Sequence, residues 1–187
     1  MMLQAEVQEV KLVSAVGIDY SKLRNLLASK KWQEADRETA RLMLRAAKRE
    51  EKGWLNRESM AEFPYDELQT IDQLWVKYSN GHFGFSVQQR IYENVRASSE
   101  DDSEIWQTFR DRVGWLKKGE KFHYSHLNFS EQAPEAHLPV VSLFVGFVGT
   151  EIESGSFEQQ CGVLAGLGGV IFQAIASRLL KCNITIR

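Results

Sequence analysis

The apolar residues of this chain recur mostly at three- and four-residue spacing, the repeat of a helix that buries one face. Five stretches follow this pattern, namely residues 20–27, 32–46, 66–78, 86–95 and 105–113. A shorter helix is expected from near Asn56 to Phe63, because the residue before Pro64 disfavours helical torsions. Together these elements predict an all-α fold, a compact helical domain with long ordered loops.

Several polar residues and glycines mark the expected helix ends. Asp19 and Ser86 precede apolar stretches and are expected to act as N-caps. Asn80-Gly81 and Gly114 follow such stretches, and Asn and Gly readily take the left-handed conformation that ends a helix. The only sign of β structure before the last third of the chain is a minimal hairpin over residues 115–122.

The chain loses helical periodicity after residue 122. Residues 123–139 read as a long ordered loop, and residues 159–177 carry no charge but several glycines. That uncharged length lies at the lower edge of a membrane span, but Gln173 and the glycines favour a buried helix. The sequence predicts a lead-in over 1–16, a helical domain over 17–139 and an appended apolar Gly-rich segment over 140–187. The domain is expected to fold without the residues beyond Thr150.

Composition narrows the class of protein. The formal charge is −2, so no basic stripe is available for general binding to nucleic acid. The two cysteines, Cys161 and Cys182, form no Cys-x-x-Cys pair, which argues against a zinc site or a disulfide scaffold and for a reducing compartment. The first eleven residues contain Glu6 and Glu9 where a secretory signal would need an apolar run.

Candidate catalytic and metal-binding chemistry is sparse. His123 and His126 could approach one metal ion, but no Cys or acidic cluster beside them completes a coordination shell. No Gly-x-Ser-x-Gly elbow is present, and the Gly-x-Gly-Gly at residues 166–169 has no Lys-Ser/Thr after it. We therefore expect no catalytic residues, no metal ligands and no catalytic cofactor, which means a protein that is not an enzyme.

Aromatic residues are concentrated at or beside the loops between helices. They are Trp54, Phe63, Phe83, Phe85, Trp115, Phe122, Tyr124 and Phe129. Most of them can be explained as the closing layer of a small helical core. A concave apolar surface of this kind would also suit a flat ligand with anionic edges, provided that cations stand at its rim. The cations available for this are Arg90, Arg110, Arg112, Lys117, Lys118 and Lys121.

The stretch from Tyr78 to Arg90 reads Tyr-Ser-Asn-Gly-His-Phe-Gly-Phe-Ser-Val-Gln-Gln-Arg and is highly specific. Further matching motifs are Gly17-Ile18-Asp19-Tyr20, Trp54-Leu55 before Phe63-Pro64, Val113-Gly114-Trp115 and Ala133-Pro134-Glu135-Ala136-His137-Leu138-Pro139. In this order they resemble the genomes-uncoupled-four domain over about residues 17–139. The chain is identified as a member of that family.

The resemblance implies a helical fold shaped like a cupped hand, whose palm binds protoporphyrin IX or magnesium-protoporphyrin IX. It also implies regulation of magnesium chelatase, and hence of chlorophyll biosynthesis, through contact with the large porphyrin-binding subunit. A cyanobacterial cytoplasm or a plastid stroma is the implied location, with peripheral association with membranes. The ligand-binding residues expected from the loop aromatics and the matching motifs are Trp54, Leu55, Phe63, Phe83, Phe122, Tyr124, Phe129 and His137.

Two departures from the family pattern lie in the region that the resemblance assigns to the ligand. The loop before Ala133 usually carries tryptophans, and here it offers Phe122, Tyr124 and Phe129. Val145 and Val148 stand at about the places where the family puts arginines against the porphyrin carboxylates. Val145, Val148 and the apolar C-terminal segment favour an alternative, a protein-interaction module of the same fold that has lost or altered porphyrin binding.

Overall fold

The computed structural model describes residues 10–115, 124–140 and 168–181, and within these ranges every regular element is a helix. The helices are α1 (Ser21–Ala28), α2 (Trp32–Ala46), α3 (Arg57–Ala61), α4 (Tyr65–Tyr78), α5 (Phe85–Arg96), α6 (Asp102–Arg112), the 3-10 helix η1 (Tyr124–His126) and α9 (Gly168–Lys181). The all-α fold class is confirmed. All of the predicted hairpin at residues 115–122 except Trp115 lies outside the described residues.

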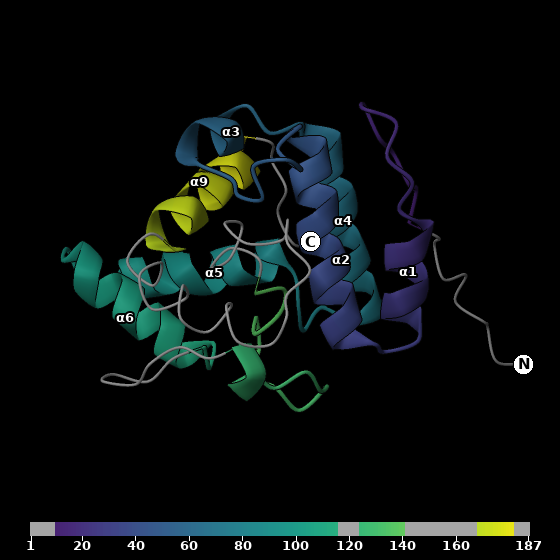
Figure 1. Ribbon diagram of the computed structural model, residues 1–187. Helices are drawn as coiled ribbons and strands as arrows, with labels where there is room; N and C mark the ends of the chain where they lie inside the picture. The colour runs from purple at the N-terminus through teal and green to yellow at the C-terminus, as the bar shows by residue number, and fades with distance from the viewer. Residues whose placement is uncertain (1–9, 116–123, 141–167, 182–187) are drawn as a thin grey trace, which may run out of the picture.

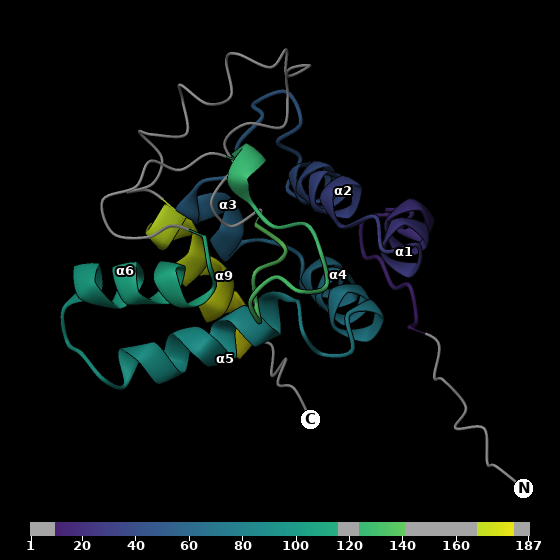
Figure 2. The same cartoon turned by 90° about the horizontal axis from the view of Figure 1, so that it is seen from below.

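The helices form two groups that meet at α4 (Figures 1 and 2). In one group α1 packs against α2 and α4, and in the other α5 packs against α6 and α9. Helix α9 also packs against the short helix α3, and α4 contacts α2, α5 and α9. Because α4 contacts both groups, the helices share one buried core.

The first group is centred on three aromatic rings. Trp32 and Trp75 are stacked with ring centroids 5.9 Å apart, and the edge of Phe83 meets Trp32 at 5.3 Å. The indole nitrogen of Trp75 donates to the hydroxyl of Thr39 at 2.9 Å, which satisfies its polar atom inside the core. The three rings are almost completely buried, and they hold α2 and α4 together with the turn that follows α4.

A second aromatic cluster joins α5, α6 and α9. The ring of Phe109 lies 4.6 Å from that of Phe172 and 5.4 Å from that of Trp115, measured between centroids. Tyr92 meets Phe109 at 5.5 Å, and Trp106 stacks on Phe109 at 5.6 Å. Offset and edge-on pairs of this kind stabilise a core beyond the area that they bury.

Most of the predicted helix ends are confirmed by the backbone. Asn80 and Gly81 have φ of 53° and 79°, and Gly114 has φ of 74°. Asn56 begins α3 with a capping box, in which its side chain accepts from Ser59 N–H and the Ser59 hydroxyl accepts from Asn56 N–H.

The predicted caps of the first and fifth helices need correction. Asp19 accepts a hydrogen bond from Ser21 N–H at 2.9 Å but stands one residue before the N-cap position. The cap assigned to Ser86 is wrong, because Ser86 lies inside α5 and its N–H donates to the Asp72 carboxylate at 2.9 Å. The carboxylate at this helix end therefore comes from α4, which sequence spacing alone could not indicate.

Helix α9 lies within the segment that the sequence analysis sets apart as appended. Its residues Phe172, Ile175 and Leu179 are almost completely buried, and the Nε of Arg178 donates to Phe63 O at 2.9 Å. The boundary at residue 139 therefore stays a prediction, which truncation can test. Among the residues that the structure describes, no helix is long and apolar enough to cross a membrane.

Candidate functional site

A mostly non-helical segment, residues 124–140, runs between the two groups of helices and is called the closing segment below (Figure 2). Its second half is tied by main-chain hydrogen bonds to the turn between α4 and α5. Ala136 N–H donates to His82 O at 2.9 Å, and Gly84 N–H donates to Leu138 O at 3.0 Å. The turn and the closing segment are thus paired almost as two strands would be.

A glutamine side chain adds to this pairing. The amide nitrogen of Gln88 donates to Ala136 O at 3.1 Å and to Pro139 O at 2.7 Å. Gln88 is fully buried on α5, so the two carbonyl groups receive donors where water cannot reach them. The specific motif between residues 79 and 90 therefore holds the closing segment in place.

The carboxylate of Asp36 on α2 binds both ends of the closing segment. The hydroxyl of Tyr124 donates to Asp36 Oδ2 at 2.9 Å, and Val140 N–H donates to Asp36 Oδ1 at 2.6 Å. These partners lie 16 positions apart in the chain, so one buried side chain fixes the span between them.

Burial dominates the electrostatics of this carboxylate. Desolvation raises the pKa of Asp36 to about 6, against the smaller lowering effects of the Val140 and Tyr124 hydrogen bonds and of Arg37. Burial and the neighbouring Asp36 also raise the pKa of the Tyr124 phenol well above its ordinary value. Tyr124 therefore acts as a neutral hydrogen-bond donor at any physiological pH.

His137 is built into the closing segment as a buried, neutral imidazole. Its Nδ1 lies 2.7 Å from Val113 O, and its Nε2 accepts from Asn128 N–H at 3.2 Å. Desolvation lowers its pKa, although the Val113 hydrogen bond acts in the opposite direction. The carbonyl of His137 accepts from the Trp115 indole at 2.6 Å. With both ring nitrogens engaged, His137 has a supporting role here, and its predicted ligand contact stays a prediction.

Tyr124 and Phe129 form an aromatic pair in the closing segment. Their ring centroids lie 5.1 Å apart, and the guanidinium of Arg37 lies 5.8 Å from the Tyr124 ring. Phe129 is half-buried and Arg37 is exposed. This pair offers aromatic surface with a cation beside it, at the N-terminal part of α2.

Trp54 lies at the other end of α2, in the loop that leads to α3. It is 42% exposed, an unusual fraction for a tryptophan in this protein. The guanidinium of Arg49 lies 4.3 Å from the centroid of its ring, and Arg49 Nε donates to Trp54 O at 3.0 Å. Arg49 therefore holds both the ring and the backbone of Trp54.

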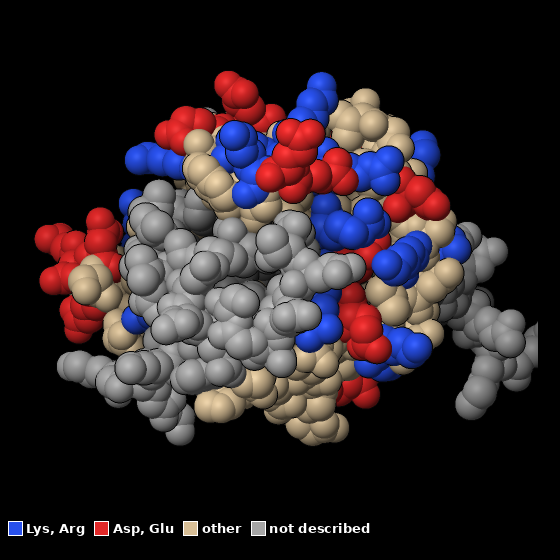
Figure 3. All heavy atoms as spheres, viewed as in Figure 1, with Lys and Arg blue, Asp and Glu red and all other residues tan. Residues whose placement is uncertain are grey.

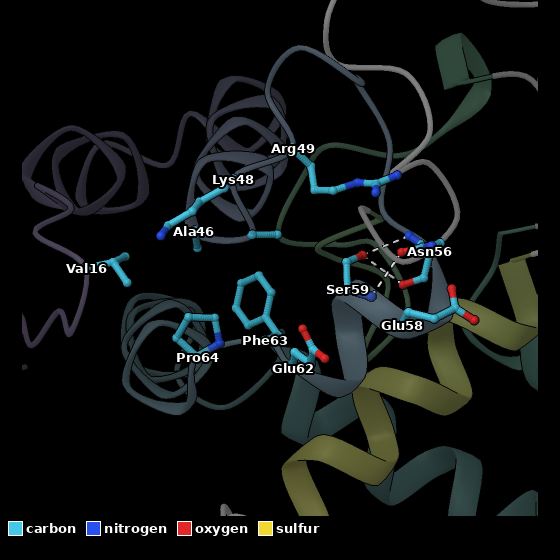
Figure 4. A pocket seen from close by; sticks show the side chains of 11 residues that line it. Val16, Ala46, Lys48, Arg49, Asn56, Glu58, Ser59, Glu62, Phe63 and Pro64 are labelled. Atoms are coloured by element: carbon cyan, nitrogen blue, oxygen red, sulfur yellow. Dashed lines mark hydrogen bonds between the residues drawn. The ribbon is translucent and has the colours of Figure 1, made fainter.

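A cavity of about 490 Å³ lies beside this loop, between the end of α2, the helix α3 and the start of α4 (Figure 4). Its lining residues are Val16, Ala46, Ala47, Lys48, Arg49, Asn56, Glu58, Ser59, Glu62, Phe63 and Pro64. Phe63 is fully buried and forms part of its apolar wall, whereas Leu55 is buried in the core. The cavity thus combines apolar walls with a few polar groups, the usual composition of a small-molecule site.

The structure brings the predicted site residues into separate places. Tyr124 and Phe129 lie together near the start of α2, and Trp54, Leu55 and Phe63 lie near its end. The remaining described candidates, Phe83 and His137, are buried supports of the core and the closing segment. Phe122 lies outside the described residues. As a set of ligand contacts the eight residues stay a prediction.

Two residues of this region were missed by the sequence analysis. Asp36 stands among charged and small residues in α2, and no local pattern distinguishes a buried carboxylate there from a solvated one. Arg49 likewise stands in a run of charged residues, 48–52, in which no local pattern distinguishes it. The one usable signal was the proximity of Arg49 to Trp54, five positions later, in a loop that is otherwise polar.

Charge and metal-binding groups do not define a separate site. Lys and Arg side chains alternate with Asp and Glu over α2 and around α3, so the described surface of these two helices has no large field of one sign (Figure 3). Within the described ranges no group of three or more His, Cys, Asp or Glu side chains could hold a metal ion. Aromatic surface and single cations are therefore the features that a ligand would meet on this face.

Comparison with known proteins identifies the family. The chain matches the family described as GUN4-like over residues 13–152. It is 34% identical over 139 residues to the Ycf53-like protein of Synechocystis sp. PCC 6803, covering 72% of this chain and 56% of that protein. It is 28% identical over 136 residues to the chloroplastic tetrapyrrole-binding protein of Arabidopsis thaliana, covering 66% and 49% respectively. The chain spans about half the length of these relatives.

The fold agrees with solved structures. The structure of GUN4 from Chlamydomonas reinhardtii superposes with a TM-score of 0.68 at 27% identity, covering 91% of this chain and 95% of that one. The ligand-free structure of Arabidopsis thaliana GUN4 has a TM-score of 0.63 at 23% identity, covering 86% and 96%. Because the family match covers residues 13–152 and includes the motif that supports the closing segment, the chain belongs to the GUN4-like family.

Proposed function

We propose that this protein is a non-enzymatic tetrapyrrole-binding protein, which takes protoporphyrin IX or magnesium-protoporphyrin IX on the face that α2 shares with the closing segment. The observation that carries the proposal is an aromatic residue beside a cation at each end of α2, with exposed ring surface on Trp54 and partly exposed ring surface on Phe129. Trp54 stands with Arg49, and the Tyr124–Phe129 pair stands with Arg37. A related protein of Arabidopsis carries the name tetrapyrrole-binding protein, which supports this ligand class.

The proposed ligand is held by contact and charge, without covalent chemistry. A macrocycle can stack on the exposed ring of Trp54 or contact the half-buried ring of Phe129, and its carboxylates can pair with arginines. The buried ionisable groups of the region, Asp36 and His137, already have partners within the protein. Their roles as supports favour a binding protein over a catalyst.

The proposed biological role is regulation of magnesium chelatase through its large porphyrin-binding subunit. Relatives from a cyanobacterium and a chloroplast support a cyanobacterial cytoplasm or a plastid stroma as the place of action. Association with membranes is proposed as peripheral. Chelatase activity measured with and without this protein, at limiting porphyrin, tests the role: stimulation supports it, and an unchanged rate contradicts it.

Ligand binding is tested by titrating the purified chain with protoporphyrin IX and following both the porphyrin absorbance and tryptophan fluorescence. Saturable binding at micromolar or lower concentration is expected, with quenching that is reduced in Trp54→Phe. Arg45→Met on the exposed side of α2 serves as a surface control and should bind as the wild type does. A folded protein that binds no porphyrin would contradict the proposal.

The second candidate is a protein-interaction module that kept the fold. It is favoured by Val145 and Val148, which stand where the resemblance places arginines. In that case the folded chain would bind the chelatase subunit with equal affinity whether porphyrin is present or not. Porphyrin-dependent binding would instead favour the tetrapyrrole-binding function.

A further inference from the structure

Arg49 has a hydrogen-bonding capacity that the described part of the chain leaves unused. Its Nε is bound to Trp54 O, but its Nη2 is buried and no described residue accepts from it. Leaving a buried guanidinium N–H group without an acceptor is energetically unfavourable, because the group has lost its hydrogen bonds to water and has no hydrogen bond within the protein to replace them. The free Nη2 therefore calls for an acceptor that is not a described part of the protein.

The cavity provides a place for such an acceptor. Arg49 is one of its lining residues, and in Figure 4 its side chain extends along the edge of the cavity toward Asn56. Lys48 stands at the same rim and is exposed. Asn56 is already engaged in the capping box with Ser59, and in Figure 4 Lys48 points toward Val16, so the Arg49 guanidinium is the group at this edge that can bind an anion.

The acidic residues of the cavity do not cancel this preference. Glu58 and Glu62 are exposed, so water screens their charges, and in Figure 4 the carboxylate of Glu58 is turned away from the cavity. The Arg49 Nη2, in contrast, is shielded from water. A charge in the less hydrated environment acts more strongly on a nearby ligand.

We propose that Arg49 is a carboxylate anchor for the bound tetrapyrrole, with Trp54 as the stacking surface beside it; this inference rests on the proposed function. The guanidinium covers one part of the Trp54 ring, and the exposed part remains for a macrocycle. A propionate of that macrocycle then reaches around the ring into the cavity and accepts from the half-buried Arg49 guanidinium.

The experiment compares a free acid with its ester. Protoporphyrin IX and its dimethyl ester have the same macrocycle, but the ester carries no carboxylate charge. Binding of each to the full chain is followed by the absorbance of the porphyrin, a signal that comes from the ligand and not from Trp54 fluorescence. In Arg49→Met the dissociation constant for the free acid should rise about tenfold or more, and that for the ester should change little.

Two further variants complete the test. Arg45→Met removes an exposed cation four positions earlier and should leave both constants unchanged. Arg49→Lys keeps the charge and should retain part of the preference for acid over ester. Circular dichroism and urea unfolding show that the variants are folded.

The outcomes separate the two proposals. If Arg49→Met weakens acid and ester equally, Arg49 only positions Trp54, and the anchor is overturned while tetrapyrrole binding stands. If Arg49→Met changes neither constant, the anchor is also overturned. If the folded wild type binds neither porphyrin, both the proposed function and the role of Arg49 as an anchor are contradicted.

Discussion

The carboxylate of Asp36 links α2 to two distant residues of the closing segment. It is 3% exposed, accepts from Tyr124 and from Val140, and so ties the closing segment to α2 at both ends. Its ionised form is disfavoured by burial, and its pKa is raised to about 6. Asp72 is buried on α4, where it accepts from Ser86 N–H, and burial raises its pKa to about 6 as well.

The raised pKa of Asp36 predicts a particular dependence of stability on pH. The folded protein binds the proton of the Asp36 carboxyl more tightly than the unfolded chain does. The stabilising contribution of protonated Asp36 is therefore fully present below about pH 4 and is lost as pH rises through 6. Asp36→Asn does not titrate, so between pH 4 and 7 it should gain stability relative to the wild type. The gain should reach at most about 3 kcal/mol, from a shift of about two units.

Urea unfolding of both proteins at pH 4, 5, 6 and 7 measures this difference. Asp72 titrates in the same direction in both proteins, so its effect cancels when the two curves are subtracted. Curves that run parallel across this range would show that burial does not raise the pKa of Asp36 in the folded protein.

At the scale of elements, the turn between α4 and α5 is the part that organises the site. Gly84 in this turn has φ of +135° and donates to the closing segment through Leu138 O. A Cβ at this position would lie 2.8 Å from Val76 Cγ2 and 3.0 Å from Asp72 Oδ1. The turn therefore requires glycine both for its backbone conformation and for the close approach of α4.

Gly84→Ala should lower the free energy of unfolding by more than Gly81→Ala does. Both positions have positive φ, but nothing lies within 4 Å of a Cβ at Gly81, so that variant carries only the backbone strain of about 1–2 kcal/mol. The difference between the two, measured by urea unfolding, reports the clash with Val76 and Asp72. Equal losses of unfolding free energy in both variants would mean that Val76 and Asp72 on α4 can move aside for the methyl group without an energetic penalty.

At the scale of the whole molecule, α9 joins parts of the chain that are far apart in sequence. It packs against α3, α4 and α5, and its Phe172 completes the aromatic cluster with Tyr92 and Phe109. The sequence alone predicts that the helical domain folds without residues beyond Thr150. The contacts of α9 predict that the domain needs this helix.

Phe172→Ala should therefore destabilise the full chain by about 3–5 kcal/mol, the usual cost of removing a large aromatic ring from a core. Ser177→Ala, on the exposed side of the same helix, should stay within about 0.5 kcal/mol of the wild type. A chain ending at Thr150 should unfold at a lower urea concentration than the full chain. An unchanged midpoint for the truncated chain would instead support the boundary at residue 139.

Much of the fold could be predicted because its information is local. The period of apolar residues placed α1, α2, α4, α5 and α6 to within a few residues, and Asn80, Gly81 and Gly114 ended helices where their backbone preferences indicated. The motif from residue 79 to residue 90 also identified the family. Helical period and left-handed turns depend on neighbours in sequence, so one chain is enough to recognise them.

Tertiary structure alone decided which polar side chains became supports and which aromatic rings stayed accessible. The partners of Asp36 lie 88 and 104 positions away, and Val113 O, the partner of His137 Nδ1, lies 24 positions away. The sequence places both Phe83 and Trp54 in loops, yet Phe83 is 1% exposed and Trp54 is 42% exposed. Burial depends on how distant segments close over a residue, so it is a property of the packed chain and not of its local pattern.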